Sequence, residues 1–434
     1  MHTGMSFSNP YTKSSGRTIW PGLVFIFLPA AFGANQCVNP SGSGGCLASI
    51  NAAIAAAGAN DTVTVARGTY AEDVIVNKPI AVLGAGSEQT IINALGLANG
   101  FNVDGLSHPG LSHVIISGFT VTNANFQGIV ITNASDVLIR DNHVIGNDRS
   151  LQPFAAGGPV CPGIAPYFQA GEGFDCGEGI HLSGVNHSIV SGNLVERNAG
   201  GILISDDTAP NHDNLITGNT VQDNPYDCGI TLASHHFALS PQDPNVGVYR
   251  ITVRGNTSAR NGLATGEGAG VGIFTGPPGA QNWGDVVVGN TLTDNALPGV
   301  ALHTHTVFQK LTDHLIAGNT ISGNGPDSDP GTTVPTGIVV FSDTAGGAAP
   351  ITGVVITGNT IKNEGIDVAV KTPGEVDVHL NNFFGDLGVD NLGTGTVSAT
   401  LNWWKCAKGP GSNGCSAIAG SGIQVEPWLS QPEK

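Results

Sequence analysis

The sequence predicts an all-β protein, a single-stranded right-handed parallel β-helix in which the chain winds through stacked coils of short strands. A phrase of the form apolar-x-Gly-Asn-Thr-apolar recurs along the chain. Glycine is abundant, with 63 of 434 residues, and only 2 residues are methionine, as in turn-rich all-β proteins. A β-propeller would need hairpin turns and four antiparallel strands in each unit, and the sequence contains no sign of either.

The asparagines of the phrase mark the coils of the predicted helix. They are Asn193, Asn219, Asn256, Asn290, Asn319 and Asn359, with a weaker copy at Asn142 and a copy at Phe119 in which Phe replaces Asn. The intervals between them run from 26 to 40 residues, which is one coil plus loops of variable length. A second asparagine follows five residues after most copies, at positions 147, 198, 224, 261, 295 and 324.

Each part of the phrase has a physical reason. Alternating apolar residues place one side chain inside the coil and the next outside. Gly and Asn both tolerate left-handed backbone conformations, so together they supply a bend. Asparagines at matching places on successive coils can hydrogen-bond into an internal ladder that satisfies backbone groups at that bend.

The first coils are predicted from residue 46 onward. An Ala-rich segment with Ile50 and Ile54 four residues apart predicts a short helix over residues 46–57, which covers the open end of the stack. Residues 62–66 alternate and predict a strand, and further strands are expected over residues 68–70, 74–76 and 80–83. We therefore expect an N-terminal cap over residues 34–60, the β-helix over 61–400 and a C-terminal cap over 401–434.

The N-terminal residues 1–33 are predicted to be a signal peptide. Lys13 and Arg17 precede an apolar segment, residues 19–32, that is short for a membrane span. Ala31 and Gly33 place small residues at −3 and −1 of a cleavage site. We expect a secreted, periplasmic or cell-surface protein with no membrane span in its mature form.

The cysteines agree with export. Three local pairs, Cys37–Cys46, Cys161–Cys176 and Cys406–Cys415, are predicted to be disulfides that close loops, because such pairs are typical of exported proteins. Cys228, the odd cysteine, is expected to be a small buried side chain. No Cys-x-x-Cys or Cys/His spacing appears, so we predict no zinc site.

Charge limits the partners. Charged residues make up 11% of the chain and the formal net charge is −17. Such a chain repels phosphate backbones, so we expect no nucleic-acid partner. We expect a monomer, and the groove described below suits a polysaccharide or cell-surface glycan.

Ionisable residues follow the apolar strands at matching places. Aligning the Gly-apolar phrases puts Ser205, Ala233, Phe274, His303 and Phe341 in one outward column. The next outward place holds Asp207, His235, Gly276, His305 and Asp343. Coils lie about 4.8 Å apart, so Asp207 and His235 are predicted to be hydrogen-bonding neighbours.

These columns and the adjoining turns supply the candidate site residues. The catalytic candidates are Asp206, Asp207, Tyr226, Asp227, His235, His303 and His305. The substrate-binding candidates are His181, Ser205, His236, Phe274 and Phe341, with the two phenylalanines expected to stack on sugar rings. Insertions at residues 149–178, 237–248 and 324–336 are expected to wall a groove beside the columns.

Each candidate also has a structural interpretation. Asp206 and Asp207 precede Thr-Ala-Pro and could simply form a turn, and the histidines could be solvated loop residues. Asp327 and Asp329, in Pro-Asp-Ser-Asp-Pro-Gly, could bind calcium or form a turn. Calcium is therefore the one cofactor left open, and none is firmly implied.

The coils resemble the right-handed parallel β-helix repeats of the pectin lyase-like superfamily, in its exported bacterial form. The resemblance rests on Ala66-Arg-Gly-Thr-Tyr70 near the start, on the Gly-Asn-Thr coils, and on Asn402-Trp403-Trp404 with Val425-Glu-Pro-Trp428 at the end. It covers nearly all of the predicted mature chain and implies the fold. It does not imply one activity, because the superfamily holds lyases, hydrolases, epimerases, esterases and non-enzymes.

The known catalytic sets of the superfamily do not carry over intact. Asp206-Asp207 and His235 resemble the two middle motifs of polygalacturonase-like hydrolases, but the acid of the first motif and the basic residues of the last are missing. A hydrolase needs two carboxylates, and Asp227 with Asp206 or Asp207 could supply them. The arginine base of pectate lyase-like enzymes has no counterpart that faces the groove.

The sequence therefore supports two functional hypotheses. One is an exported enzyme that binds and processes an extended polysaccharide, by hydrolysis or by lyase chemistry with a histidine base and Tyr226 as the acid. The other is a non-catalytic β-helix, adhesin-like or glycan-binding.

Overall fold

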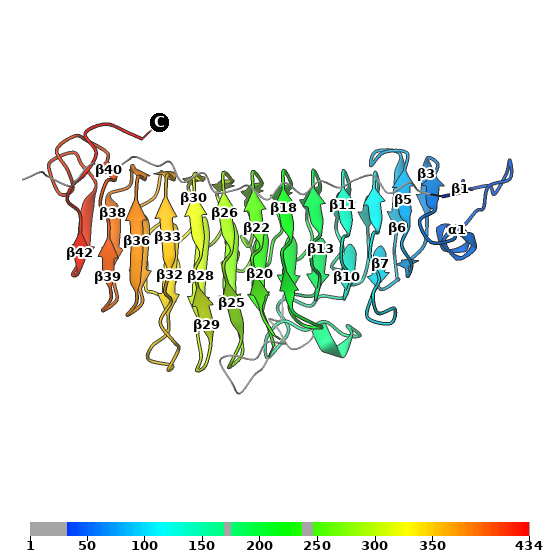
Figure 1. Ribbon diagram of the computed structural model, residues 1–434, viewed down its shortest axis with the longest axis horizontal. Helices are drawn as coiled ribbons and strands as arrows, with labels where there is room; N and C mark the ends of the chain where they lie inside the picture. The colour runs from blue at the N-terminus through cyan, green and yellow to red at the C-terminus, as the bar shows by residue number, and fades with distance from the viewer. Residues whose placement is uncertain (1–32, 169–174, 237–245, 434) are drawn as a thin grey trace, which may run out of the picture. The chain divides into compact units, whose positions relative to one another are not determined.

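A computed structural model of the chain describes residues 33–168, 175–236 and 246–433. The predicted leader, residues 1–33, lies outside these residues except for Gly33. The described chain forms one continuous stack of coils, with the coils in sequence order from α1 (Ile50–Ala56) at one end to the last strands at the other (Figure 1). In the described part of the chain, no helix is long and apolar enough to cross a membrane.

Three parallel sheets, named A, B and C here, run along the stack, and a complete coil contributes one strand to each. Sheet A contains β1 (Asn35–Val38), β2 (Thr62–Val65), β5 (Ala81–Gly84), β8 (Ile115–Ser117), β11 (Leu138–Arg140), β14 (Ile189–Ser191), β18 (Leu215–Thr217), β22 (Thr252–Arg254), β26 (Val286–Val288), β30 (Leu315–Ala317), β33 (Val354–Thr357), β36 (Glu375–His379), β39 (Thr396–Ser398) and β42 (Ile423–Gln424). Sheet B contains β3 (Gly68–Tyr70), β6 (Thr90–Asn93), β9 (Thr120–Thr122), β12 (His143–Ile145), β15 (Leu194–Glu196), β19 (Thr220–Gln222), β23 (Thr257–Ala259), β27 (Thr291–Thr293), β31 (Thr320–Ser322), β34 (Thr360–Lys362), β37 (Asn382–Phe383) and β40 (Trp403–Trp404).

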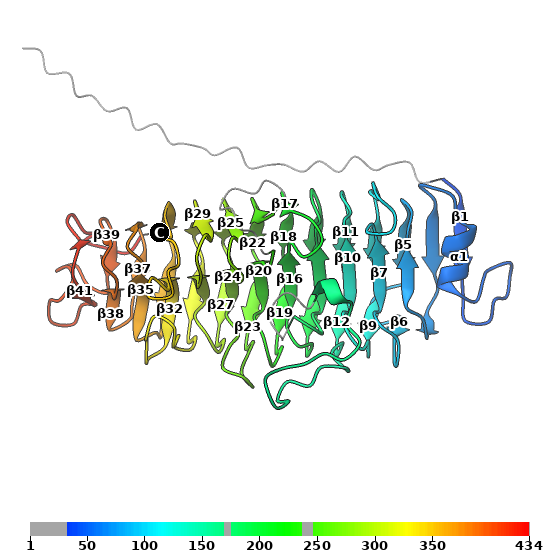
Figure 2. The ribbon, with the colours of Figure 1, turned by 90° about the horizontal axis from the view of Figure 1, so that it is seen from below.

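Sheet C carries the predicted site residues. It contains β4 (Val74–Val76), β7 (Phe101–Asp104), β10 (Ile129–Thr132), β13 (Ile180–Ser183), β16 (Ile202–Ser205), β20 (Ile230–Ser234), β24 (Val271–Thr275), β28 (Val300–Thr304), β32 (Thr336–Ser342), β35 (Ile366–Lys371), β38 (Leu387–Asn391) and β41 (Ala417–Gly420). A shorter sheet D, between sheets C and A in the chain, contains β17 (Asn211–His212), β21 (Val248–Tyr249), β25 (Gln281–Trp283) and β29 (Lys310–Thr312) (Figure 2).

The alternating pattern fills the inside of the coils with aliphatic side chains. In sheet A, Ile216 of β18 stacks between Val190 and Val253 of the neighbouring coils, and all three are buried. Because most strands of sheets A, B and C contribute one or two such residues, a single apolar core runs through the stack. The predicted right-handed parallel β-helix is confirmed by this topology.

The predicted asparagine ladder is also confirmed. Asn219 illustrates it: its backbone amide and its Nδ2 both donate to Oδ1 of Asn256, at 2.9 and 3.0 Å, and its own Oδ1 accepts the same two bonds from Asn193. The ladder continues beyond the predicted copies through Asn381 to Asn402. The preceding glycine has positive φ, for example 63° at Gly218, which is why the bend needs glycine there.

The caps combine a helix with further strands. The predicted helix over residues 46–57 is shorter, because α1 begins after Ser49, whose hydroxyl accepts from the amide of Ala52 at 3.1 Å. The carboxylate of Glu72 accepts from the first amides of α1, at Ile50 and Asn51. The predicted cap segments also contribute strands, because β1 joins sheet A and β40, β41 and β42 extend all three sheets.

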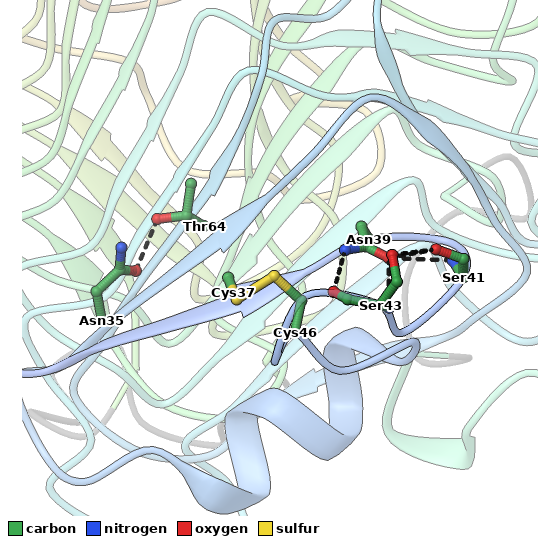
Figure 3. Close-up of a disulfide and its surroundings, with 7 residues drawn as sticks. All are labelled: Asn35, Cys37, Asn39, Ser41, Ser43, Cys46 and Thr64. Carbon is green, nitrogen blue, oxygen red and sulfur yellow. Dashed lines mark hydrogen bonds between the residues drawn. A yellow bond between two sulfur atoms is a disulfide. The ribbon is translucent and has the colours of Figure 1, made fainter.

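All three predicted disulfides are present, at Cys37–Cys46, Cys161–Cys176 and Cys406–Cys415. Figure 3 shows the first of them closing a loop in which the Asn39 side chain bonds to Ser41 and Ser43. Cys228 is buried, as predicted.

Candidate functional site

Sheet C sets the register of the candidate residues. Parallel pairing aligns Ser205 with Ala233, then with Phe274, His303 and Phe341 on the next coils, as the sequence predicts. The three predicted insertions all adjoin sheet C in the chain, since residues 149–178 lead into β13, residues 324–336 reach β32, and residues 237–248 follow β20. Residues 169–174 and 237–245 of these insertions lie outside the described residues. The five residues of this column are all buried.

Two separate clusters replace the single surface that the column predicts. The first cluster lies on β13, β16 and β20 and contains Asp207 and His235. The second lies on β28 and contains His303 and His305. Gly276 occupies the matching place after β24, so no titratable side chain of that column joins the two clusters.

Asp206 holds the backbone of the neighbouring coil. Its carboxylate accepts from the amides of His235 at 2.7 Å and Gly247 at 2.7 Å, and from the Ser234 hydroxyl at 2.8 Å. The amide of His236 adds a longer bond of 3.2 Å. With four donors and a side chain that is 1% exposed, Asp206 has no oxygen left for a substrate. This geometry gives the predicted catalytic candidate a structural role.

Asp207 and His235 form the predicted hydrogen bond, at 3.1 Å, but inside a closed network. The other ring nitrogen of His235 lies 3.4 Å from Oδ2 of Asp175. Asp207 also accepts from the Ser205 hydroxyl, and His181 lies 2.8 Å from that hydroxyl and 3.5 Å from Asp207. The side chains of Asp207 and His235 are at most 3% exposed.

The charges in this network are fixed by their neighbours. Burial opposes ionisation of Asp207, yet the charge of His235 and hydrogen bonds from His181 and His235 hold the pKa of Asp207 far below its usual range. Burial likewise opposes the charge on His235, but the carboxylates of Asp175 and Asp207 raise its pKa well above the usual value. Burial lowers the pKa of His181. We conclude that an imidazolium sits between two carboxylates.

A group of three buried acids adjoins this network. One carboxylate oxygen from each of Asp175, Glu178 and Asp227 lies within 4.8 Å of the others. Burial, and then the negative charges of Asp227 and Asp175, raise the pKa of Glu178 well above its usual value. Neither oxygen of Glu178 has a hydrogen-bond partner among the described residues, and its side chain is 1% exposed. The pKa of the Glu178 carboxyl group therefore lies well above its usual value.

Local packing holds the acids in place. A β-carbon at Gly200 would lie 2.3 Å from an oxygen of Glu178, so the acid occupies the space that the glycine leaves open. Asp227 accepts from the amide of Cys228 at 2.5 Å. Tyr226, half-buried beside it, meets the exposed ring of Phe154 edge-on, with centroids 6.1 Å apart.

Sequence reasoning selected Tyr226 and Asp227 but not Glu178 or Asp175. A signal was present in the sequence, because the phrase Asp-Cys-Gly occurs at Asp175, where two residues separate it from β13, and again at Asp227, directly before β20. The structure brings the two aspartates together although the coil of β16 lies between β13 and β20. Their alignment was hidden by the long insertion that carries the first copy.

The second cluster joins two histidines to a loop. His303 lies 2.8 Å from Oδ2 of Asp327 through Nε2 and 3.3 Å from Oδ2 of Asp329 through Nδ1. His305 reaches the same Asp329 oxygen at 2.9 Å. Although burial opposes its charge, bonds to the two aspartates raise the pKa of His303 to about 9. Asp327 and Asp329, predicted from the sequence as turn or calcium-binding residues, thus contact the side chains of His303 and His305.

The remaining substrate-binding candidates are unevenly exposed. Phe274 and Phe341 are 8% and 5% exposed and meet His303 edge-on, so they offer little ring surface to a sugar. His181 and Ser205 are fully buried in the first cluster. His236 is exposed at the end of β20.

Comparison with solved structures gives likenesses at the level of the fold. The GH87 alpha-1,3-glucanase of Streptomyces thermodiastaticus strain HF3-3 matches with 18% identity and a TM-score of 0.51, over 88% of this chain and 65% of that one. The GH136 lacto-N-biosidase of Eubacterium ramulus matches with 11% identity and a TM-score of 0.55, over 91% and 68%. The DFA-IIIase of Arthrobacter chlorophenolicus A6, without its lid, matches with 12% identity and a TM-score of 0.51, over 88% and 95%.

This chain therefore spans about two thirds of the length of the first two of these structures. No curated protein sequence matches it. The family described as "Right handed beta helix region" matches residues 80–307, which is more than half of the chain. By this match and by its stacked parallel sheets, the chain belongs to the right-handed beta helix region family.

Proposed function

We propose that the protein is a glycoside hydrolase that acts outside the cytoplasm on an extended polysaccharide lying along sheet C. One observation carries the proposal: Glu178, a carboxyl group whose pKa burial raises well above its usual value, lies beside the carboxyl group of Asp227. Hydrolysis of a glycosidic bond uses this combination of a protonated acid and a second carboxylate. The three disulfides support a site outside the reducing cytoplasm.

Each residue of the site has a place in this mechanism. Glu178 protonates the oxygen of the leaving sugar, and Asp227 attacks or stabilises the anomeric carbon from the other side. Because these two residues are 1% and 5% exposed, the mechanism requires the residues above them to move aside when the substrate binds. His235 is a positioning residue, because its imidazolium balances the charges of Asp175 and Asp207. Tyr226 and His236, both at least partly exposed, are proposed to contact the substrate at the rim.

The separation of the two acids suggests the stereochemical outcome. Their nearest oxygens lie within 4.8 Å. Retaining glycosidases place the two carboxyl groups about 5 Å apart, whereas inverting enzymes leave about 6.5–9.5 Å for a water molecule. The expected products therefore keep the anomeric configuration, which proton NMR of the first products reports directly.

The test is an activity screen with matched variants. Purified protein is incubated with neutral glucans, fructans, pectin and alginate, and new reducing ends are measured. Glu178→Gln and Asp227→Asn should each lower the rate by about 10²–10⁴-fold. Glu375→Gln, at an exposed residue of β36, is the matched control and should leave the rate unchanged. A Glu178→Gln variant as active as the wild type would refute the proposal.

A second candidate is a polysaccharide lyase that uses calcium. The same three carboxylates favour it, because oxygen ligands suit Ca²⁺ and the Glu178 oxygens have no hydrogen donor among the described residues. Lyase products absorb at 235 nm, whereas hydrolysis products do not. Absorbance at 235 nm that EDTA abolishes would favour the lyase. Neither binding nor product on any glycan would favour a non-catalytic β-helix.

A further inference from the structure

We infer that His303, His305 and Asp329 form a binding site for a divalent transition-metal ion such as Zn²⁺. The three ligand atoms are Nδ1 of His303, Nε2 of His305 and a carboxylate oxygen of Asp329, and all lie within 4.8 Å of one another. This site is on β28 and the loop before β32, outside the acid cluster of the proposed hydrolase, and does not depend on it.

The spacing of the ligand atoms suits a four-coordinate ion. Oδ2 of Asp329 is 3.3 Å from Nδ1 of His303 and 2.9 Å from Nε2 of His305. Atoms that each lie about 2.1 Å from a tetrahedral ion are about 3.4 Å from each other. Small side-chain shifts would therefore admit the ion, and two imidazoles with one carboxylate suit Zn²⁺ or Fe²⁺ better than Ca²⁺.

Asp327 supplies the second observation. It lies 2.8 Å from Nε2 of His303, so that nitrogen donates to Asp327, and Nδ1, 3.3 Å from Asp329, is the nitrogen that would give up its proton to bind a metal ion. Histidine ligands of metals commonly donate their other N–H to a carboxylate in this way.

The loop that carries the aspartates is held in place without a metal. The amide of Asp327 donates to the Thr332 hydroxyl at 2.7 Å, and the amide of Thr332 donates back to the carbonyl of Asp327 at 2.9 Å. The amide of Asp329 donates to the other Asp327 oxygen at 3.1 Å. Lys371 donates to the carbonyl of Pro330 at 3.2 Å, which fixes the far side of the loop.

The site is open on one side. The side chains of Asp329 and His305 are 45% and 37% exposed, while His303 is buried between the edges of Phe274 and Phe341. Three protein ligands and an open position are typical of metal sites that also bind water or a substrate. No Cys/His spacing in the sequence predicts this site, because the ligands come from a strand end and from a loop 24 residues away.

The test is Zn²⁺ titration by calorimetry, with Co²⁺ absorption spectra as a report of ligand geometry. The wild-type protein should bind one Zn²⁺ per chain, and His305→Ala and Asp329→Asn should each weaken binding at least about tenfold. Asp327→Asn, which keeps all three ligands, should weaken it by about 10–100-fold. Zn²⁺ should raise the melting temperature of the wild type but not that of His305→Ala.

The matched control is His108→Ala, because His108 is also an exposed histidine beside an aspartate, 3.4 Å from Asp104. This variant should bind Zn²⁺ as the wild type does. Undetectable Zn²⁺ binding by the wild type, or binding that survives both His305→Ala and Asp329→Asn, would overturn the inference.

Discussion

Adjacent aspartates in this protein have opposite roles, and the difference comes from what each carboxylate faces. Asp206 accepts mainly from backbone amides and fixes the next coil. Asp207 faces two histidine rings across the coils. The sequence places both residues at the end of a strand but does not reveal their partners. Asp206 accepts from the backbone amides of His235 and Gly247, and a backbone amide is present whatever the side chain.

At the residue scale we predict that Asp207→Asn destabilises the protein by about 3 kcal/mol, because it leaves the buried His235 imidazolium with one carboxylate fewer. The folded-state pKa of Asp207 is lowered, so its contribution is present above about pH 4 and is lost as the pH falls. Urea unfolding at pH 6 should show the loss. Asp377→Asn, at an exposed residue of β36, should change stability by less than about 0.5 kcal/mol.

At the scale of the strand and its bend, the recurring Gly-Asn phrase predicts most of the structure. It determines the coil register, and the register correctly aligns Ser205 with His303 along sheet C. The phrase does not predict that the side chains of this column are buried, because the insertions beside the column contain no repeat. The same limit explains why Asp175 and Glu178, inside the longest insertion, were passed over as site residues.

The second asparagine series ends on an acid rather than an amide. Asn324 donates its amide and its Nδ2 to the same oxygen of Glu364, at 3.1 and 3.0 Å. Burial raises the pKa of Glu364 to about 7, and its other oxygen has no partner among the described residues. The ladder therefore ends on a group whose charge depends on pH near neutrality.

We predict that Glu364→Gln stabilises the protein at pH 8 by about 2 kcal/mol and has little effect near pH 4.5. The folded pKa lies above the ordinary value of 4.5, so wild-type stability falls as the pH rises through about 7. Glutamine keeps the accepting oxygen and carries no charge. Unfolding curves at both pH values measure the difference, and equal stability of the two proteins at pH 8 would contradict the prediction.

At the scale of the whole molecule, the β-helix supplies a frame on which stacked coils bring together residues that are distant in sequence. Asp175 and Asp227 are 52 residues apart in sequence and lie within 4.8 Å. His305 and Asp329 meet in the same way. The fold could be predicted almost completely from its repeats, whereas the site depends on loops whose conformation no repeat determines.

The central claim is that Glu178 is a protonated acid at neutral pH, and carbon-13 NMR of glutamate side-chain carboxyls tests it most directly. The resonance that disappears in Glu178→Gln should keep the chemical shift of a protonated carboxyl at pH 7 and titrate well above the ordinary value of 4.5. Titration of that resonance near pH 4.5 would contradict the claim and remove the general acid from the proposed mechanism.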